Sequence, residues 1–90
     1  MQINNMKIEK KVYQEYFEKI ISGDKKFELR LADWECCKGD ILVLREVDGD
    51  KNYTGREIEK EVTYVIKTKD VDYFTENEVE KYGYQVISFD

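Results

Sequence analysis

The sequence contains no histidine and only two cysteines, and this scarcity excludes many common reactive sites. Without histidine the chain cannot form a Ser–His or Cys–His nucleophilic pair, and it lacks the imidazole ligands of most zinc sites. Cys36 and Cys37 are adjacent, and neighbouring cysteines rarely form an unstrained disulfide, so we expect two reduced thiols. We therefore expect neither a metal nor a cofactor.

Long apolar runs and proline are also absent. No stretch approaches the roughly 18 apolar residues of a membrane helix, and no signal-peptide hydrophobic region is visible. We therefore expect a soluble, cytoplasmic protein without a membrane partner. No repeat or low-complexity linker divides the 90 residues, so we expect one domain over residues 1–90, acting as a monomer.

The charge is acidic overall but unevenly distributed. The net charge of −5 argues against indiscriminate coating of nucleic acid, which requires a basic surface. Residues 1–30 contain seven Lys or Arg against five Asp or Glu, whereas residues 31–90 contain eight against fifteen. The locally basic stretch therefore lies in the first third of the chain, and most other charged residues are expected to solvate the surface.

Hydrophobic periodicity predicts an α+β fold with about five strands and one clear helix. The helix is expected over residues 12–22, with an apolar stripe that covers the sheet: Val12, Tyr13, Tyr16, Phe17, Ile20 and Ile21. The strands are expected near residues 6–10, 25–31, 41–46, 53–67 and 84–89, with a short helical turn at 75–81. Long alternating strands with a covering helix favour a small, partly open mixed barrel.

The longest expected strand, residues 53–67, alternates over about thirteen residues, which predicts a bulge or bend of the kind that barrel closure needs. One face of it is expected to be apolar: Ile58, Val62, Tyr64 and Ile66. The other is expected to meet water: Glu57, Glu59, Glu61 and Thr63.

Between the helix and the next strand lies the segment Gly23-x-Lys25-x-x-Glu28-x-Arg30. Gly23 suits the left-handed backbone just past a helix end. The alternation that follows predicts that Glu28 and Arg30 share one sheet face, roughly 7 Å apart, with Lys25 at the start of the strand. We expect the opposite set to enter the core: Phe27, Leu29 and Leu31.

This spacing resembles the signature of the ASCH domains, small PUA-like barrels linked to RNA, and looks closest to their short, single-domain branch. Further stretches resemble the family in the same order over nearly the whole chain: residues 15–17, 38–46, 53–57 and 62–66. The resemblance implies a PUA-like fold. It also implies that Lys25, Glu28 and Arg30 face a pocket beneath the helix.

The resemblance implies binding of RNA or a nucleotide in that cleft. Lys25 can contact a phosphate, Glu28 can accept hydrogen bonds from a base edge, and Arg30 offers a planar fork. Three more residues are secondary candidates for clamping a single-stranded base: Arg45, Tyr53 and Arg56. The alternative interpretation of this second group is a hairpin end with Tyr53 packed on the core.

An enzyme is the alternative hypothesis. Some proteins similar to this one are amidohydrolases that deacetylate N4-acetylcytidine through a lysine, a threonine and a later glutamate. Lys25 corresponds to the lysine, whereas Glu28 occupies the threonine position, so Lys25 and Glu28 would be the catalytic pair on N4-acetylcytidine or a related modified nucleoside. A third possibility is that an acidic strand face meets a basic protein or protects the strand from edge pairing: Glu57, Glu59 and Glu61.

Overall fold

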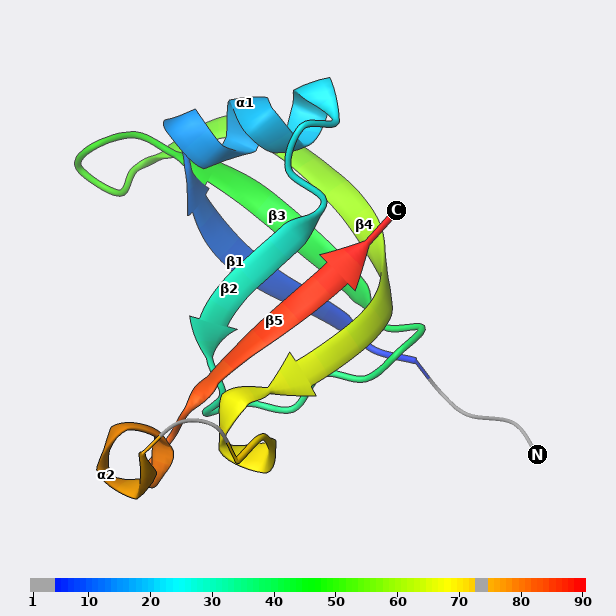
Figure 1. Cartoon of the computed structure of the whole chain (residues 1–90). Helices are drawn as coiled ribbons and strands as arrows, with labels where there is room; N and C mark the ends of the chain where they lie inside the picture. The colour runs from blue at the N-terminus through cyan, green and yellow to red at the C-terminus, as the bar shows by residue number, and fades with distance from the viewer. Residues whose placement is uncertain (1–4, 73–74) are drawn as a thin grey trace.

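The computed structural model describes residues 5–72 and 75–90 and has an α+β fold (Figure 1). Five strands form a mixed sheet in the order β1-β3-β4-β5-β2, accompanied by two helices. In chain order the elements are β1 (Lys7–Tyr13), α1 (Gln14–Ser22), β2 (Phe27–Leu31), β3 (Ile41–Val47), β4 (Tyr53–Lys67), the 3-10 turn η1 (Thr68–Asp70), α2 (Glu76–Val79) and β5 (Tyr84–Phe89).

The long strand β4 joins two halves of the sheet. Its first part pairs antiparallel with β3, which pairs parallel with β1, and its last part pairs antiparallel with β5, which pairs with β2. The sheet curls so that β1 and β2 approach each other (Figure 1). In the part of the chain that the structure describes, no backbone pairing joins these two strands. The five strands and mixed pairing are confirmed, whereas the sheet is not closed; we call the gap between β1 and β2 the open seam.

The hydrophobic core fills the concave side of the sheet, and helix α1 covers one end of it (Figure 1). Phe17 and Ile20 are the buried residues of this helix. Gly23 ends it with φ of 88°, and its N–H donates to the Ile20 carbonyl at 3.1 Å, as the sequence predicts. The remaining core comes mainly from the strands: Val12, Leu42, Leu44, Val62, Ile87 and Phe89.

The predicted start of the helix is wrong by two residues. Val12 and Tyr13 belong to β1, where they pair with Glu46 and Val47 of β3. That pairing comes from a distant part of the chain and extends β1 beyond its predicted end. Only part of the predicted apolar stripe is therefore buried, because the side chains of Tyr13, Tyr16 and Ile21 remain exposed.

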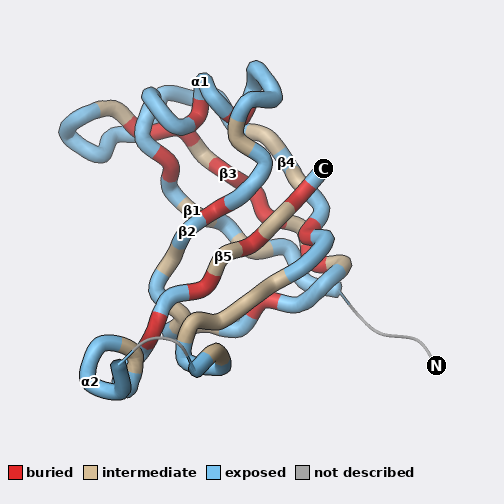
Figure 2. Tube along the Cα trace, in the orientation of Figure 1, coloured by how far each residue is buried: buried red, intermediate tan, exposed pale blue. Residues whose placement is uncertain are grey.

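The predicted orientation of β2 is also wrong. Its apolar side chains point away from the core, with Phe27, Leu29 and Leu31 46%, 59% and 48% exposed, whereas Glu28 is buried. Exposed and more buried positions alternate along β2 (Figure 2). Alternation shows which residues share a face but does not show which face is inside. The charged set can lie inside because β2 borders the open seam, where Glu28 finds two cationic partners.

The predicted irregularity in β4 is confirmed, but it changes the face of the residues that follow. The pairing with β5 shifts register between Val62 and Tyr64. Val62 is completely buried, while Tyr64 is 62% exposed. A bulge inserts one extra residue, so Tyr64 and Ile66 point outward rather than sharing the face of Val62 as predicted.

The short helix α2 falls within the predicted turn at residues 75–81, although residues 73–74 of the preceding acidic segment lie outside the described part. Among the helices that the structure describes, none has the length and apolar character to cross a membrane. Within residues 5–72 and 75–90, no cluster of three or more His, Cys, Asp or Glu side chains could ligate a metal ion.

Candidate functional site

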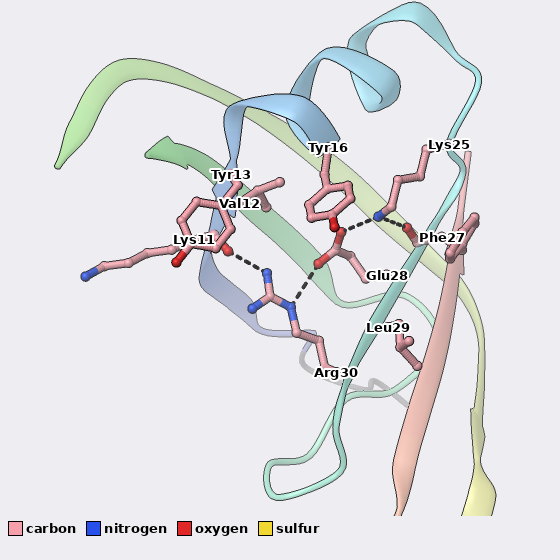
Figure 3. A pocket seen from close by; sticks show the side chains of 9 residues that line it. All are labelled: Lys11, Val12, Tyr13, Tyr16, Lys25, Phe27, Glu28, Leu29 and Arg30. Atoms are coloured by element: carbon pink, nitrogen blue, oxygen red, sulfur yellow. Dashed lines mark hydrogen bonds and ion pairs between the residues drawn. The ribbon is translucent and has the colours of Figure 1, made fainter. Parts of the chain in front are cut away.

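A pocket of about 410 Å³ opens at the seam, where β1 ends, α1 begins and β2 runs past (Figure 3). Its lining combines charged, aromatic and aliphatic side chains: Lys11, Val12, Tyr13, Tyr16, Lys25, Phe27, Glu28, Leu29 and Arg30. The three principal candidates from the sequence, Lys25, Glu28 and Arg30, are therefore brought together in one cavity beside the helix.

Glu28 lies at the centre of this charged group, with only 6% of its side chain exposed. Lys25 Nζ donates to Oε1 at 2.8 Å, and Arg30 Nε donates to Oε2 at 2.9 Å (Figure 3). Two cations thus compensate one buried carboxylate. The three side chains together carry one excess positive charge, and Lys11 adds another cation to the lining.

Backbone contacts fix the positions of the two cations. Lys25 Nζ also donates to the Phe27 carbonyl at 2.7 Å, and the Lys25 N–H bonds the Lys19 carbonyl at 3.0 Å. The guanidinium of Arg30 donates from its terminal nitrogen to the Lys11 carbonyl at 2.6 Å, so one side chain links both edges of the open seam. The donors are therefore pre-positioned before any ligand arrives.

Aromatic side chains form the walls around the charged floor. Tyr13 and Tyr16 are 44% and 48% exposed, and Phe27 comes from β2 on the other side of the pocket. The Lys25 ammonium lies 4.8 Å from the centre of the Phe27 ring and 5.8 Å from that of Tyr16. Sequence reasoning assigned both tyrosines to the packed helix face; an aromatic pair close in sequence to the charged motif is the signal that could have marked them as pocket residues.

Arg45 and Tyr53 do not line this pocket. Arg45 lies on the outer surface of β1, β3 and β4, where it pairs with Glu9 at 3.1 Å and with Glu57 at 3.5 Å. Its guanidinium carbon is 4.0 Å from the centre of the Tyr53 ring. Arg45 and Tyr53 therefore stack on each other, away from the cavity.

Arg56 is likewise absent from the pocket lining, and its contacts are structural. It donates to both carboxylate oxygens of Glu46, at 3.0 and 2.7 Å, and also pairs with Glu18. Thr54 donates its hydroxyl to Glu46 at 2.5 Å. The hydrogen bond from Arg56, and then that from Thr54, hold the pKa of Glu46 below its usual value. The hydrogen bond to Glu46, and then that to Glu18, raise the pKa of Arg56.

The remaining reactive groups are poorly placed for chemistry. Cys36 is buried in the core, and burial is the main cause that raises the pKa of its thiol to about 11. A thiol with such a pKa is a poor nucleophile near neutral pH. Lys10 lies 3.9 Å from the centre of the Trp34 ring, and burial, followed by the nearby charge of Arg30, lowers its pKa.

With this geometry established, comparison with protein families gives one match. The family described as Domain of unknown function (DUF3850) matches residues 7–89. The chain belongs to this family. The matched range contains all five strands and every residue that lines the pocket. No curated protein matches the chain.

Proposed function

We propose that this DUF3850 chain binds RNA or a nucleotide in the pocket at the open seam. The observation that carries the proposal is the pairing of a cationic floor with aromatic walls in one cavity. A base can stack on Tyr13 or Tyr16, while the cations hold its phosphate or its acceptor atoms. The resemblance to ASCH domains supports the same ligand class.

The donors at the floor favour a ligand that is rich in acceptors. The Glu28 carboxylate receives a hydrogen bond on each oxygen, whereas Lys25 and Arg30 each retain N–H groups beyond the bonds described. Phosphate oxygens and carbonyl oxygens of a base edge suit such donors. Glu28 then acts as a positioning residue that holds both cations toward the ligand.

The size and charge of the molecule favour a small ligand or a short single strand. A cavity of about 410 Å³ suits one nucleotide. The net charge of −5 weakens binding to a long polyanion, for which affinity depends on many phosphate contacts. We expect one unpaired base in the pocket, with its neighbours largely outside it.

The fold belongs to the same proposal. We propose that the curved sheet is a PUA-like barrel that stays open between β1 and β2. The five strands, their mixed pairing and the helix over one end support this assignment. In such an arrangement the open seam is the ligand entrance, and Arg30 is the side chain that connects its two edges.

A hydrolase remains the second candidate because Lys25 Nζ lies only 2.8 Å from Glu28 Oε1 in the pocket. The contacts of Lys25 favour binding over catalysis. Its Nζ donates to a carboxylate and to a carbonyl, so the nitrogen is held as a hydrogen-bond donor at the pocket floor. We therefore propose the binding function, and the experiment below also tests for hydrolysis.

The test is an NMR titration of labelled protein with a short single-stranded RNA, a nucleoside monophosphate and N4-acetylcytidine. We expect the first two ligands to shift the backbone resonances of residues 23–30 and Tyr16. Arg30→Lys keeps the charge but loses the planar fork, and it should raise the dissociation constant roughly tenfold. Arg45→Lys is the matched control and should leave the affinity unchanged.

Three results would count against the proposal. Shifts that cluster around Arg45 and Tyr53 instead of the pocket would move the site to the outer surface. Equal affinities for Arg30→Lys and the parent protein would show that the Arg30 guanidinium does not contribute to ligand binding. Release of acetate from N4-acetylcytidine, abolished by Lys25→Met, would establish the hydrolase in place of a binding function.

A further inference from the structure

The two halves of the sheet present opposite kinds of surface to the outside. The outer surface of β1, β3 and the first part of β4, which we call the charged face, is covered by ionised side chains: Lys7, Glu9, Lys11, Arg45, Glu57 and Glu59. The outer surface of β2, β5 and the end of β4, which we call the apolar face, consists of Phe27, Leu29, Leu31, Tyr64 and Tyr84, with Ile66 and Val86 between them.

The apolar side chains of this face are strongly exposed. Tyr64 is 62% and Tyr84 50% exposed, similar to the three apolar side chains of β2. The outward positions of the described strands on this face also include Ser88, and none of them carries a charge. A contiguous apolar surface on an otherwise highly charged chain marks a surface that is covered by another molecule.

The chemistry of the face selects among possible partners. A nucleic acid needs cations, and a basic or acidic protein segment needs opposite charges, whereas the outward positions of this face offer neither. A second copy of the chain carries the same net charge of −5, and a surface without charge lets the two copies meet without placing like charges together. The apolar face is such a surface, while the charged face is unsuited to this role.

The strand registers make the face complementary to itself. Phe27, Ser88 and Tyr64 form one row across the three strands, Leu29, Val86 and Ile66 form the next, and Leu31 and Tyr84 form the third. A two-fold rotation about the middle row places the first row of one copy against the third row of the other. Phe27 of one copy then lies over Leu31 of the other, and Tyr84 lies over the small Ser88, with Tyr64 beside it.

The available area is close to what a stable dimer needs. Five side chains that are about half exposed, at roughly 200 Å² each when fully exposed, offer on the order of 500 Å² per copy. Ile66 and Val86 add to this, and a rim of neighbouring residues brings the area toward the roughly 600–1,000 Å² per partner of standard interfaces. We propose that the apolar face is the interface of a homodimer.

This dimer would place the partner beside the ligand pocket. Phe27 and Leu29 lie on the apolar face and also border the pocket, because β2 forms the rim of the pocket. The second copy therefore covers the outer side of the strand whose inner side carries Glu28 and Arg30. The dimer itself is inferred from the surface alone and does not depend on what the pocket binds.

Sedimentation velocity over a range of protein concentrations tests the proposal. We expect a reversible dimer that Tyr64→Lys and Leu31→Lys each weaken at least ~tenfold in dissociation constant, since each change introduces two buried ammonium groups. Neither residue lines the pocket. The matched control is Ile21→Lys on α1, whose side chain is 49% exposed outside the apolar face, and it should leave the dimer intact.

A second measurement makes the result independent of any variant. In a mixture of isotope-labelled and unlabelled parent protein, intermolecular NOEs should connect Phe27 of one copy with Leu31 of the other, and Tyr64 with Tyr84. A parent protein that stays monomeric up to ~1 mM would overturn the proposal. So would a dimer that persists in the Leu31→Lys, Tyr64→Lys double variant, or one without those NOEs. Lys25→Met, which changes only the pocket, should still dimerise even if RNA binding is absent.

Discussion

Glu28 and Glu46 are two buried carboxylates that both pair with cationic side chains, yet their surroundings differ. Glu28 is 4% exposed and lies between Lys25 and Arg30, while Glu46 is 1% exposed and is held by Arg56 and Thr54. The first borders a cavity with aromatic walls, and the second does not. A buried carboxylate with cationic partners is therefore not in itself evidence of a binding site; the cavity beside Glu28 is the feature that supports the proposed binding.

The largest expected difference concerns stability. Arg56→Met removes the arginine that donates to both oxygens of Glu46. Of the donors to this carboxylate that the structure describes, Thr54 then remains. Arg30→Met leaves Glu28 with Lys25 at the edge of an open pocket. We expect Arg56→Met to lower the melting temperature by roughly 10 °C, and Arg30→Met by clearly less. Thermal unfolding followed by circular dichroism compares them, and an equal loss in both variants would remove the distinction.

Ligand affinity should depend on the cations around Glu28 and not on the arginine that holds Glu46. Lys25→Met removes one charged donor from the pocket floor and should weaken binding of a nucleoside monophosphate roughly tenfold in isothermal calorimetry. Lys38→Met is the control, because this exposed lysine lies outside the pocket lining. Arg56→Met, measured below its melting temperature, should bind as the parent protein does. Weaker binding in Arg56→Met than in Lys25→Met would mean that Glu46 also supports the site.

The pH dependence of stability should report on Glu46. Its pKa in the folded protein lies below its usual value, chiefly because of the hydrogen bond from Arg56. The folded state therefore gains stability above the unfolded pKa and loses it as the pH falls through the lower, folded pKa. Between pH ~5 and pH ~3, we expect the melting temperature of the parent to fall further than that of Glu46→Gln, by about 5 °C. Parallel pH curves for the two proteins would contradict this assignment.

The smallest effect is expected from Thr54→Val, a nearly isosteric change. It removes the hydroxyl that donates to Glu46 at 2.5 Å but leaves both bonds from Arg56. We expect a fall of about 3 °C in melting temperature, because the carboxylate keeps both bonds from Arg56 and the loss is about 0.5 kcal/mol, the low end for one hydrogen bond. Ligand affinity should not change, since Thr54 is outside the pocket lining. A larger loss than in Arg56→Met would show that the hydroxyl, not the guanidinium, is the main partner of Glu46.

The elements that sequence reasoning predicted best are those with strong local signals. The alternation of β2, the bulge in β4 and the helix end at Gly23 all depend on short-range patterns, and all are present. The spacing of the motif likewise predicted that Lys25, Glu28 and Arg30 would lie together.

The errors arise where distant segments decide the outcome. Val12 joins β1 because β3 pairs with it, and no local signal contains that information. Which face of β2 points inward depends on the open seam and on the cations available there. Arg45 and Arg56 lie outside the pocket lining, and their role in ligand binding stays a prediction. The sequence does not show their carboxylate partners: Glu9 and Glu57 for the first, Glu18 and Glu46 for the second.

The pairing of β2 has a consequence for how the protein is made. Within the described sheet β2 bonds only to β5, and Phe27 lies opposite Ser88 near the far end of the chain. As the polypeptide leaves the ribosome, the strand that carries Glu28 and Arg30 must wait, unpaired, until β5 has emerged. The β1–β3–β4 half can assemble earlier, because its strands are all synthesised by then. The pocket is therefore completed only after β5 has been synthesised, and until then its charged and apolar side chains remain accessible to chaperones.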